Sequence, residues 1–550
     1  MVQTRASLPS LANGATGSFT PVKLLLALSF LLVCAAPSFA KDEPEAKTPP
    51  DAKAETAKPA DHPPEEPKLS VTEHSVMIGG KPVKYKAVAG YLVLKDEIED
   101  QPDKEGKKEA APDEQKDPVK AKAKIFFIAY TREGVDVPGR PVTFAFNGGP
   151  GAASVWLHLG ALGPRRVKLA PVPEQTSPPY QLVDNDSSWL DDTDLVFIDP
   201  VSTGYSRPVP GESAKPFHGF EGDIKSVASF IRLYTTRYNR WLSPKFIVGE
   251  SYGGTRAAAL STFLQDRYNI YLNGIVIVSG LLNWQTAAFS SGNNLPYILA
   301  LPTEAATAWY HKKLSPSLQA KTVDEVRSEA ESFASGDYLH ALEQGSALPD
   351  DARKQIAGRI SELTGVPVEF ILRFHLRFPS QEFEHELLKS ENRTVGRFDT
   401  CFTGIGYDPK NMGFDPSFEA VKGAFTATIN DYLRTDLKFE SDLPYETLAN
   451  VEPWDFSNVE NQFLDVSDNL GEAMSENPHL KVWVTLGCYD LAVPYYGTDY
   501  TLRQMPIDPV LRPNIRITRY ETGHMIYTHE DALVKLKADF DAFLHDAVPH

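Results

Sequence analysis

A series of short apolar segments, separated by stretches with helical periodicity, is the feature of this sequence that most limits its fold. Each segment is rich in Val, Ile and Phe and is bounded by Gly, Pro, Asp or Asn, as is typical of strands covered on both faces. The segments are 124–130, 142–146, 195–198, 246–248, 275–278, 482–486 and 515–518. Apolar residues recur at three-to-four spacing between them, for example over 224–234 and 529–544. This alternation predicts an α/β fold, a mostly parallel central sheet with helices on both faces.

The alternation stops between about 285 and 450 and resumes after 480. Helical patterns dominate this stretch, at 324–333, 350–363, 368–374 and 381–388. We therefore expect 286–450 to be a helical cap inserted into one core, rather than a separate domain. The two parts of that core are then 70–285 and 451–550.

Two segments, 41–69 and 97–122, are rich in Pro, Ala, Lys, Glu and Asp. Such a composition cannot bury enough apolar surface to fold. We expect the first to be a disordered tether and the second to be a charged, solvated insertion or hairpin tip within the first part of the core. A hairpin is predicted around Gly79 and Gly80, which separate two strand-like segments.

Residues 1–40 have the pattern of a signal peptide. Arg5 and Lys23 supply positive charge, 24–36 is apolar, and small residues up to Ala40 precede a charged stretch. The apolar run is too short to span a bilayer at about 1.5 Å per residue. We expect a secreted or periplasmic protein without stable membrane insertion after cleavage; an uncleaved anchor is the alternative.

The net charge of −18 and the lack of a basic cluster argue against binding to nucleic acid or to anionic membrane surfaces. Of the three cysteines, Cys401 and Cys488 lie outside the signal peptide, and they form either one disulfide or two free thiols. Their spacing fits no zinc site, and we expect neither a metal nor another cofactor.

Residues 249–253 read Gly-Glu-Ser-Tyr-Gly, after an apolar strand and before a helix-forming stretch at 255–267. A Gly-x-Ser-x-Gly motif in this context predicts a nucleophile elbow, a turn too tight for a Cβ at the glycines. The turn lifts the Ser251 hydroxyl above the sheet, beside the N–H groups at a helix N-terminus, which can stabilise an oxyanion. Ser251 is therefore the candidate nucleophile.

A second glycine-rich turn, Asn-Gly-Gly-Pro-Gly at 147–151, follows the strand at 142–146. An elbow needs a second loop whose main-chain N–H group completes the oxyanion site, and this turn is placed for that role. An ordinary turn is the alternative. A phosphate loop is excluded because no Gly-Lys-Ser/Thr follows.

A serine nucleophile needs a base and an acid that orients the base, in the chain order Ser, Asp or Glu, His. Open α/β sheets build their sites at the carboxyl ends of strands. Asp490 and His524 follow the last two predicted strands. Asp499 and Glu521 are rival acids, and we prefer Asp490 because it is nearest a strand end.

Taken together, these motifs resemble the serine carboxypeptidases, peptidase family S10, and especially its bacterial members. The matching blocks, in family order, are 147–151, Asp-Leu-Val-Phe-Ile-Asp-Pro-Val-Ser-Thr-Gly-Tyr at 194–205, 249–253, Gly-His-Met at 523–525, and more loosely Gly-Cys-Tyr-Asp at 487–490 with Val-Pro at 493–494. The resemblance spans about 70 to 545 and implies an α/β-hydrolase fold. It implies these site residues: a catalytic triad of Ser251, Asp490 and His524; oxyanion N–H groups of Gly149 and Tyr252; and Asn147 and Glu250 as ligands of the substrate's terminal carboxylate.

The sequence departs from the family pattern around the carboxylate site. In the family, the counterpart of Glu250 pairs with a second glutamate, but Ala161 stands at that position here. Arg165 and Arg166 are candidate positive charges close by in sequence; exposed surface is the alternative. Three further departures are Ala145 in place of a tryptophan, Ala152 in place of a cysteine and Cys488 in place of an aspartate.

The expected function is that of a secreted serine carboxypeptidase, which releases C-terminal amino acids from peptides through an acyl-enzyme. An esterase or acyltransferase on the same triad is the alternative that Ala161 and Ala145 suggest. A non-catalytic α/β-hydrolase that serves as a binding module is a third hypothesis. The sequence predicts neither the oligomeric state, nor the side-chain preference, nor the pH optimum.

Overall fold

The computed structural model describes residues 69–95, 120–135, 138–405 and 414–548. All of them belong to one compact unit, 58–550. The predicted signal peptide, nearly all of the tether and most of the charged insertion lie outside the described residues. Within the described ranges, no helix is long and apolar enough to cross a membrane.

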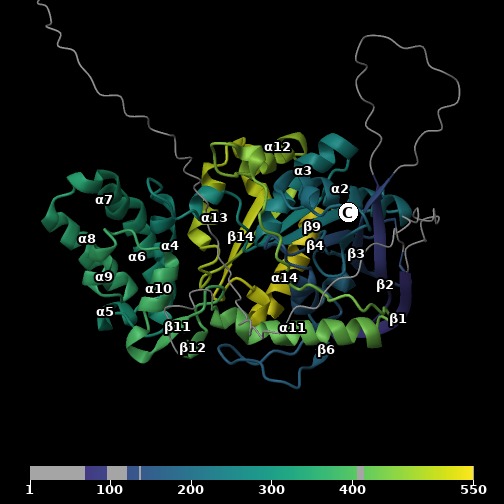
Figure 1. Ribbon diagram of the computed structural model, residues 1–550, viewed down its shortest axis with the longest axis horizontal. Helices are drawn as coiled ribbons and strands as arrows, with labels where there is room; N and C mark the ends of the chain where they lie inside the picture. Colours follow the sequence, from purple (N-terminus) through teal and green to yellow (C-terminus); the bar gives the residue numbers. More distant parts are fainter. Residues whose placement is uncertain (1–68, 96–119, 136–137, 406–413, 549–550) are drawn as a thin grey trace, which may run out of the picture. The chain divides into compact units, whose positions relative to one another are not determined.

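A mixed sheet forms the centre of the molecule, with the strand order β1-β2-β3-β7-β4-β9-β10-β13-β14 and β8 paired with β3 (Figure 1). The strands are β1 (Leu69–Ile78), β2 (Lys81–Lys95), β3 (Ala121–Arg132), β4 (Val142–Phe146), β7 (Asp194–Ile198), β8 (Arg207–Pro208), β9 (Lys245–Glu250), β10 (Gly274–Val278), β13 (Lys481–Gly487) and β14 (Ile515–Tyr520). From β7 to β14 every neighbouring pair is parallel, whereas β1 to β3 are antiparallel. Each apolar segment predicted as a strand lies in one of these strands, which confirms the mostly parallel sheet.

The parallel strands β4, β7, β9 and β10 are buried because helices cover both faces of the sheet, whereas the edge strand β14 is only partly buried. In β9, Ile247 packs in the same core cluster as residues of α2 (Phe220–Arg237) and α3 (Tyr252–Tyr268). Its neighbours Phe246 and Val248 point to the other face, into the cluster that contains residues of α11 (Pro416–Thr435) and α14 (Glu530–Ala547). Two-sided burial explains why these strands read as continuous apolar runs. The remaining core helices are α12 (Ser467–Glu476) and α13 (Tyr495–Gln504).

The antiparallel edge begins with the hairpin that the sequence predicts. Val76 pairs with Val83 and Ile78 with Lys81, so the turn consists of Gly79 and Gly80. Both glycines have positive φ, 54° and 72°, as a two-residue hairpin turn requires.

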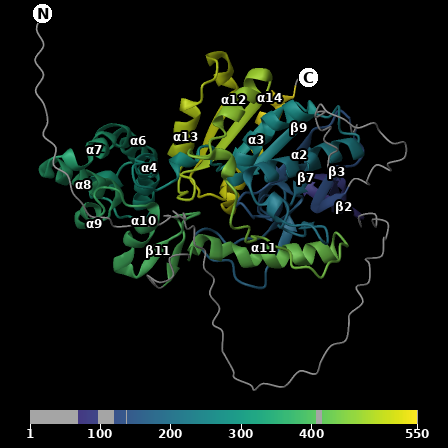
Figure 2. The ribbon, with the colours of Figure 1, turned by 45° about the horizontal axis from the view of Figure 1, so that its top comes forward.

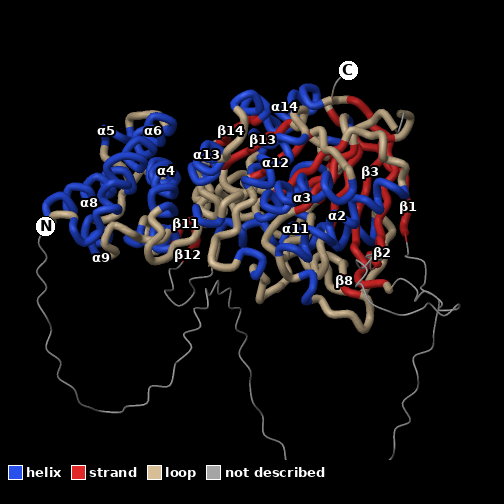
Figure 3. Tube along the Cα trace, turned by 90° about the horizontal axis from the view of Figure 1, so that it is seen from above, coloured by secondary structure: helices blue, strands red, loops and turns tan. Residues whose placement is uncertain are grey.

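Helices dominate the chain between β10 and β13, beside the sheet and next to α13 (Figures 1 and 3). Those that match the predicted helical stretches are α6 (Val323–Phe333), α8 (Asp350–Thr364), α9 (Val368–Arg373) and α10 (Ser380–Glu386). A longer helix, α4 (Leu295–Tyr310), packs against both α6 and α13 and so links this group to the core. The same stretch ends with a small hairpin of β11 (Arg393–Val395) and β12 (Thr403–Ile405), followed by α11, which lies along the core (Figure 2). Shorter elements are α1 (Val155–Leu157), β5 (Arg165–Val167), β6 (Leu182–Asp184), α5 (Pro316–Gln319) and α7 (Leu339–Gln344).

The two cysteines, whose pairing the sequence does not decide, are free thiols in the structure. Cys401 and Cys488 are both buried. Burial raises the pKa of Cys401 well above its usual value of 9.0 and that of Cys488 to about 11. Both therefore remain protonated and unreactive while the protein is folded.

Candidate active site

Ser251 lies between β9 and α3, in the strand–turn–helix context that the motif predicts. Its backbone is strained for a residue with a side chain, with φ 62° and ψ −126°. Its N–H donates to the carbonyl of Val278 on the neighbouring strand, at 3.0 Å. A Cβ on Gly249 would overlap the carbonyl oxygen of Gly253, and one on Gly253 would lie 2.9 Å from the carbonyl oxygen of Phe146. The turn therefore requires glycine on both sides of the serine.

His524 and Asp490, which follow the last two strands, form a buried pair. The imidazole Nδ1 lies 2.7 Å from Asp490 Oδ2. The other carboxylate oxygen of Asp490 accepts hydrogen bonds from the N–H groups of Ala492 and Val493, at 2.8 and 2.9 Å. With Nδ1 occupied, Nε2 is the nitrogen left to exchange a proton with a nucleophile.

The surroundings of this pair set its charge. Burial lowers the pKa of His524, but the charge of Asp490 and the hydrogen bond to it outweigh burial, so the net shift is upward from 6.5. Burial raises the pKa of Asp490, and His524 partly offsets this shift. The Phe398 ring stacks on the imidazole at 5.1 Å between centroids, which fixes the plane of the ring.

Ser251 and His524 lie at the same carboxyl edge of the sheet, because β9, β13 and β14 run parallel. Glu250, the residue before the serine, is close enough for its charge to raise the pKa of His524. Among the described residues, no hydrogen bond joins the serine hydroxyl to the imidazole. In serine hydrolases this bond is often long without substrate and shortens when substrate binds.

The rival acids lie elsewhere. Asp499, on α13, forms an ion pair with Arg519 of β14. Glu521 is exposed. The structure thus brings Asp490, and neither rival, to the imidazole of His524.

The glycine-rich turn at 147–151 packs against the start of α3. A Cβ added to Gly148 would lie 2.7 Å from the carbonyl oxygen of Glu250 and from the N of Gly253, and closer still to the N of Tyr252. Gly149 has a φ of 100°, a conformation that favours glycine. The main chain of this turn therefore runs beside the N–H group of Tyr252, which is the arrangement that a two-donor oxyanion site needs.

A buried polar network holds this turn in place. Asn147 accepts the N–H of Leu157 on its side-chain oxygen, at 3.0 Å, and the Arg256 guanidinium on its carbonyl, at 2.7 Å. Arg256 in turn pairs with Asp223 of α2 at 2.7 Å. Because each of these groups is almost fully buried, the network fixes both turns relative to each other.

Asn147 and Glu250 lie together with a residue that sequence reasoning missed, Tyr527. All three side chains are buried, and Tyr527 and Asn147 lie close enough to Glu250 for both to lower its pKa. Burial is the larger effect and raises that pKa to about 7. Nothing in the sequence around Tyr527 signals this position, since a lone aromatic residue three places after a histidine belongs to no catalytic motif.

Each of Arg165, Arg166 and Cys488 has a partner nearby in the structure. Arg165 and Arg166 form partly exposed ion pairs with Asp184 and Glu530, as the surface interpretation expects. Cys488 contacts the guanidinium of Arg327, which comes from α6. The replacement thus brings a thiol, rather than a carboxylate, against a cationic side chain of the helical segment.

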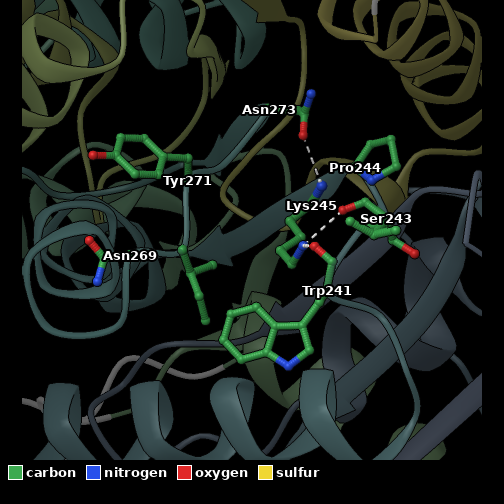
Figure 4. Close-up of a pocket in the computed structure, with 9 residues that line it drawn as sticks. Trp241, Ser243, Pro244, Lys245, Asn269, Tyr271 and Asn273 are labelled. Atoms are coloured by element: carbon green, nitrogen blue, oxygen red, sulfur yellow. Dashed lines mark hydrogen bonds between the residues drawn. The ribbon is translucent and has the colours of Figure 1, made fainter.

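A pocket of about 330 Å³ lies at the opposite edge of the sheet (Figure 4). Lys245, the first residue of β9, donates from its ammonium group to the carbonyl oxygens of Trp241 and Ser243 beside it. Asn273, just before β10, accepts the N–H of Lys245. Because the pocket lies at the amino ends of β9 and β10, it is separate from the site around Ser251.

Comparison with known proteins finds carboxypeptidases both among sequence relatives and among solved structures. Residues 115–381 match the sequence model of the serine carboxypeptidase family, peptidase S10. Serine carboxypeptidase-like 51 of Arabidopsis thaliana is 28% identical over 197 residues, 33% of this chain and 39% of that protein. Carboxypeptidase Y homolog A of Chaetomium globosum is 27% identical over 170 residues, 30% of this chain and 28% of that protein. The chain therefore matches well under half of the length of these relatives.

The crystal structure of Kex1(delta)p, a prohormone-processing carboxypeptidase from Saccharomyces cerevisiae, is similar in fold. Its TM-score is 0.52 at 17% identity, over 84% of this chain and 91% of that chain. This similarity confirms the α/β-hydrolase fold that the resemblance implies. All three of these proteins are eukaryotic, so the special likeness to bacterial members stays a prediction.

Proposed function

We propose, because this chain belongs to the serine carboxypeptidase family, that it releases single amino acids from the C-terminus of peptides. The observation that carries the proposal is the arrangement at one sheet edge. This edge holds a strained serine elbow and a buried His524–Asp490 pair. It also holds buried polar groups that lack hydrogen-bond partners among the described residues.

In the proposed reaction, His524 accepts the proton of Ser251 as the hydroxyl oxygen attacks the scissile carbonyl. The N–H groups of Gly149 and Tyr252 stabilise the oxyanion of the tetrahedral intermediate. His524 then donates the proton to the leaving amine, which leaves an acyl-enzyme. A water molecule repeats the sequence and releases the shortened peptide, while Asp490 keeps the imidazole in the required orientation.

Selection of the chain end rests on Asn147 and Glu250. An amide N–H group and a protonated carboxylic acid can each donate a hydrogen bond to a carboxylate, whereas an ionised Glu250 would repel it. The pKa of about 7 keeps Glu250 largely protonated in acidic solution. An internal peptide bond or an amidated terminus offers no carboxylate to this pair.

Ester hydrolysis or acyl transfer on the same residues is the second candidate. Ala161 stands where the resemblance places a second glutamate, so only one carboxyl remains at that point of the site. Its buried methyl group offers no hydrogen bond. Turnover of simple esters without turnover of peptides would favour this candidate.

The test compares an N-blocked dipeptide with the same dipeptide amidated at its C-terminus. We expect release of the free C-terminal amino acid from the first and little turnover of the second. Equal cleavage of both would contradict exopeptidase action. A fluorophosphonate probe should label the wild type but not Ser251→Ala, and a wild type that fails to label would point to the non-catalytic binding module.

We also propose export and a capped architecture. The charge and apolar pattern of residues 1–40 supports export, and sequencing the N-terminus of the mature protein tests it; a terminus beginning at Met1 would contradict cleavage. Helices α4 to α10 support a cap at 286–450 on a core of 70–285 and 451–550. Limited proteolysis tests this, because a cap should be cut while the core resists.

A further inference from the structure

We infer that Tyr527 is a third substrate-binding residue, whose hydroxyl donates a hydrogen bond to the C-terminal carboxylate beside Asn147 and Glu250. This inference rests on the proposed exopeptidase function and adds to it a residue, a chemical role and a selectivity. It derives from where the Tyr527 ring lies and from which polar atoms are left without partners.

The ring of Tyr527 fills the space beside the short π-helix His158–Leu162, which contains Ala161. Tyr527 lies in the short turn after His524, Ile526–Thr528, and is 3% exposed. A Cβ on Gly160 would lie 2.5 Å from Cδ2 of the ring and closer still to Cε2. Gly160 therefore leaves room for the ring, and the neighbouring Ala161 is short and apolar. The phenol thus takes the space next to the position where a second glutamate is expected.

Three buried polar atoms at this point have no hydrogen-bond partner among the described residues. They are the side-chain Nδ2 of Asn147, Oε2 of Glu250 and the hydroxyl of Tyr527. Each residue is at most 4% exposed. A lone buried group of this kind is costly and uncommon in folded proteins. Three of them on separate elements, after β4, at the end of β9 and after β14, point to a polar ligand that satisfies them together.

The three groups are near one another without satisfying one another. Tyr527 and Asn147 lower the pKa of Glu250, and Glu250 and Asn147 act on the pKa of Tyr527 in return. No contact among them has the geometry of a full hydrogen bond. Donors that were already hydrogen-bonded to one another could not donate to a ligand. The observed spacing instead leaves them able to donate to an acceptor oxygen of a bound ligand.

A carboxylate is the ligand whose chemistry fits. It offers two acceptor oxygens and no donor, and the three side chains offer an amide N–H, a phenolic O–H and the O–H of protonated Glu250. Burial raises the pKa of Tyr527 well above 10, so this donor persists at every physiological pH. A second glutamate could donate a hydrogen bond only after it had been protonated. A tyrosine hydroxyl already carries its proton and therefore supplies the donor directly.

The charges around Glu250 give this role a pH signature. Its pKa is raised by burial and by Asp490, and is lowered by His524, Tyr527 and Asn147. Removing the Tyr527 hydroxyl removes one of the contributions that lower the pKa of Glu250. The pH at which Glu250 ionises should then rise, and the alkaline decline in turnover of free-carboxyl substrates should move with it.

The test is Tyr527→Phe, assayed on two N-blocked substrates in which the scissile bond is an ester. The first keeps a free C-terminal carboxyl, and the second is matched to it but lacks that carboxyl. We expect kcat/KM to fall about 10- to 100-fold on the first, mainly through KM, as for a lost hydrogen bond to a charged group. On the second substrate it should stay within about 2-fold. The control is Tyr520→Phe at the end of β14. It removes a buried hydroxyl that donates to Asp539 of α14, and it should leave both values unchanged.

Equal losses on both substrates, or no loss on the first, would overturn the role of Tyr527. Fluorophosphonate labelling at the wild-type rate shows that the variant is folded. If Tyr527→Phe does not fold, Gly160→Ala, which pushes the ring aside and keeps the hydroxyl, should give the same selective loss. A wild type that does not distinguish the two substrates would overturn the proposed function itself. Discrimination that survives both variants would overturn only the inference about Tyr527.

Discussion

Gly148 is the position at which one added methyl group should greatly lower kcat while the protein still folds. The backbone carbonyl of Glu250 and the N of Gly253 each lie 2.7 Å from where an alanine Cβ would stand, and the N of Tyr252 is closer. All three are main-chain atoms of the elbow, so none can rotate away as a side chain would. In Gly148→Ala, the methyl group also lies directly against the N–H that is proposed to bind the oxyanion.

The size of the effect follows from these distances. Relief of the clash requires a movement of roughly 1 Å to reach ordinary van der Waals separation. A misplacement of about 1 Å costs on the order of 10²-fold in rate, and loss of one oxyanion donor costs about 10²- to 10³-fold in kcat. We therefore expect kcat to fall by about 10²- to 10³-fold, with a loss of about 1–3 kcal/mol in the free energy of unfolding from overpacking.

The assay is kcat on an activated ester, with thermal or urea unfolding measured on the same preparations. The matched control is Gly358→Ala on α8, where an added Cβ meets nothing within 4 Å. This control should keep wild-type kcat and gain about 0.5–1 kcal/mol of stability, because alanine favours the helix. A kcat for Gly148→Ala within about 3-fold of wild type would refute the assignment of the Tyr252 N–H to the oxyanion site.

Three further predictions concern the buried groups. Asp490→Asn should lower kcat by about 10⁴-fold while leaving the unfolding transition cooperative, because His524 loses its orienting acceptor; ester kinetics with circular dichroism melts check this. Burial lowers the pKa of His158 to about 3, so its stabilising contribution is complete above 6.5 and is lost as pH falls towards 3. Urea unfolding from pH 7 to 4 should show a decline of up to about 1.4 kcal/mol per pH unit from this residue, absent in His158→Gln. Cys401 and Cys488 should react with a thiol reagent only after unfolding, and fast labelling of native protein would contradict their burial.

The inner parallel strands could be predicted because burial on both faces leaves them almost entirely apolar. The strand predicted at 142–146 is β4, Val142–Phe146, without any shift in its ends. The strand predicted at 515–518 extends to Tyr520, since the exposed Arg519 breaks the apolar run but not the hydrogen-bond ladder. The short hairpin of β11 and β12 was not predicted, because three residues carry too little periodicity to read.

The elbow turn and the contact between His524 and Asp490 could be predicted for a different reason. Sterics dictate the glycines around Ser251, and the order of strands dictates where Asp490 and His524 emerge. Tyr527 escaped prediction because its role depends on a contact with Gly160, far away in the sequence. No local pattern encodes a ring that fills the gap beside a distant glycine. Whether Cys401 and Cys488 form a disulfide could not be predicted for the same reason. Pairing depends on their distance in space, which their spacing along the sequence does not give.

Stability and recognition oppose each other at this edge of the sheet. The backbone of Ser251 stores strain of order 1–3 kcal/mol, and each unpaired buried polar group costs about 1–3 kcal/mol more. The arrangement persists because neighbours hold it from several sides: the Val278 carbonyl takes the serine N–H, and the Arg256–Asp223 pair anchors the turn of Asn147. A carboxylate that satisfies Asn147, Glu250 and Tyr527 would return part of this cost on binding. The polar atoms that weaken the folded protein are therefore the ones proposed to bind the carboxylate of a free chain end.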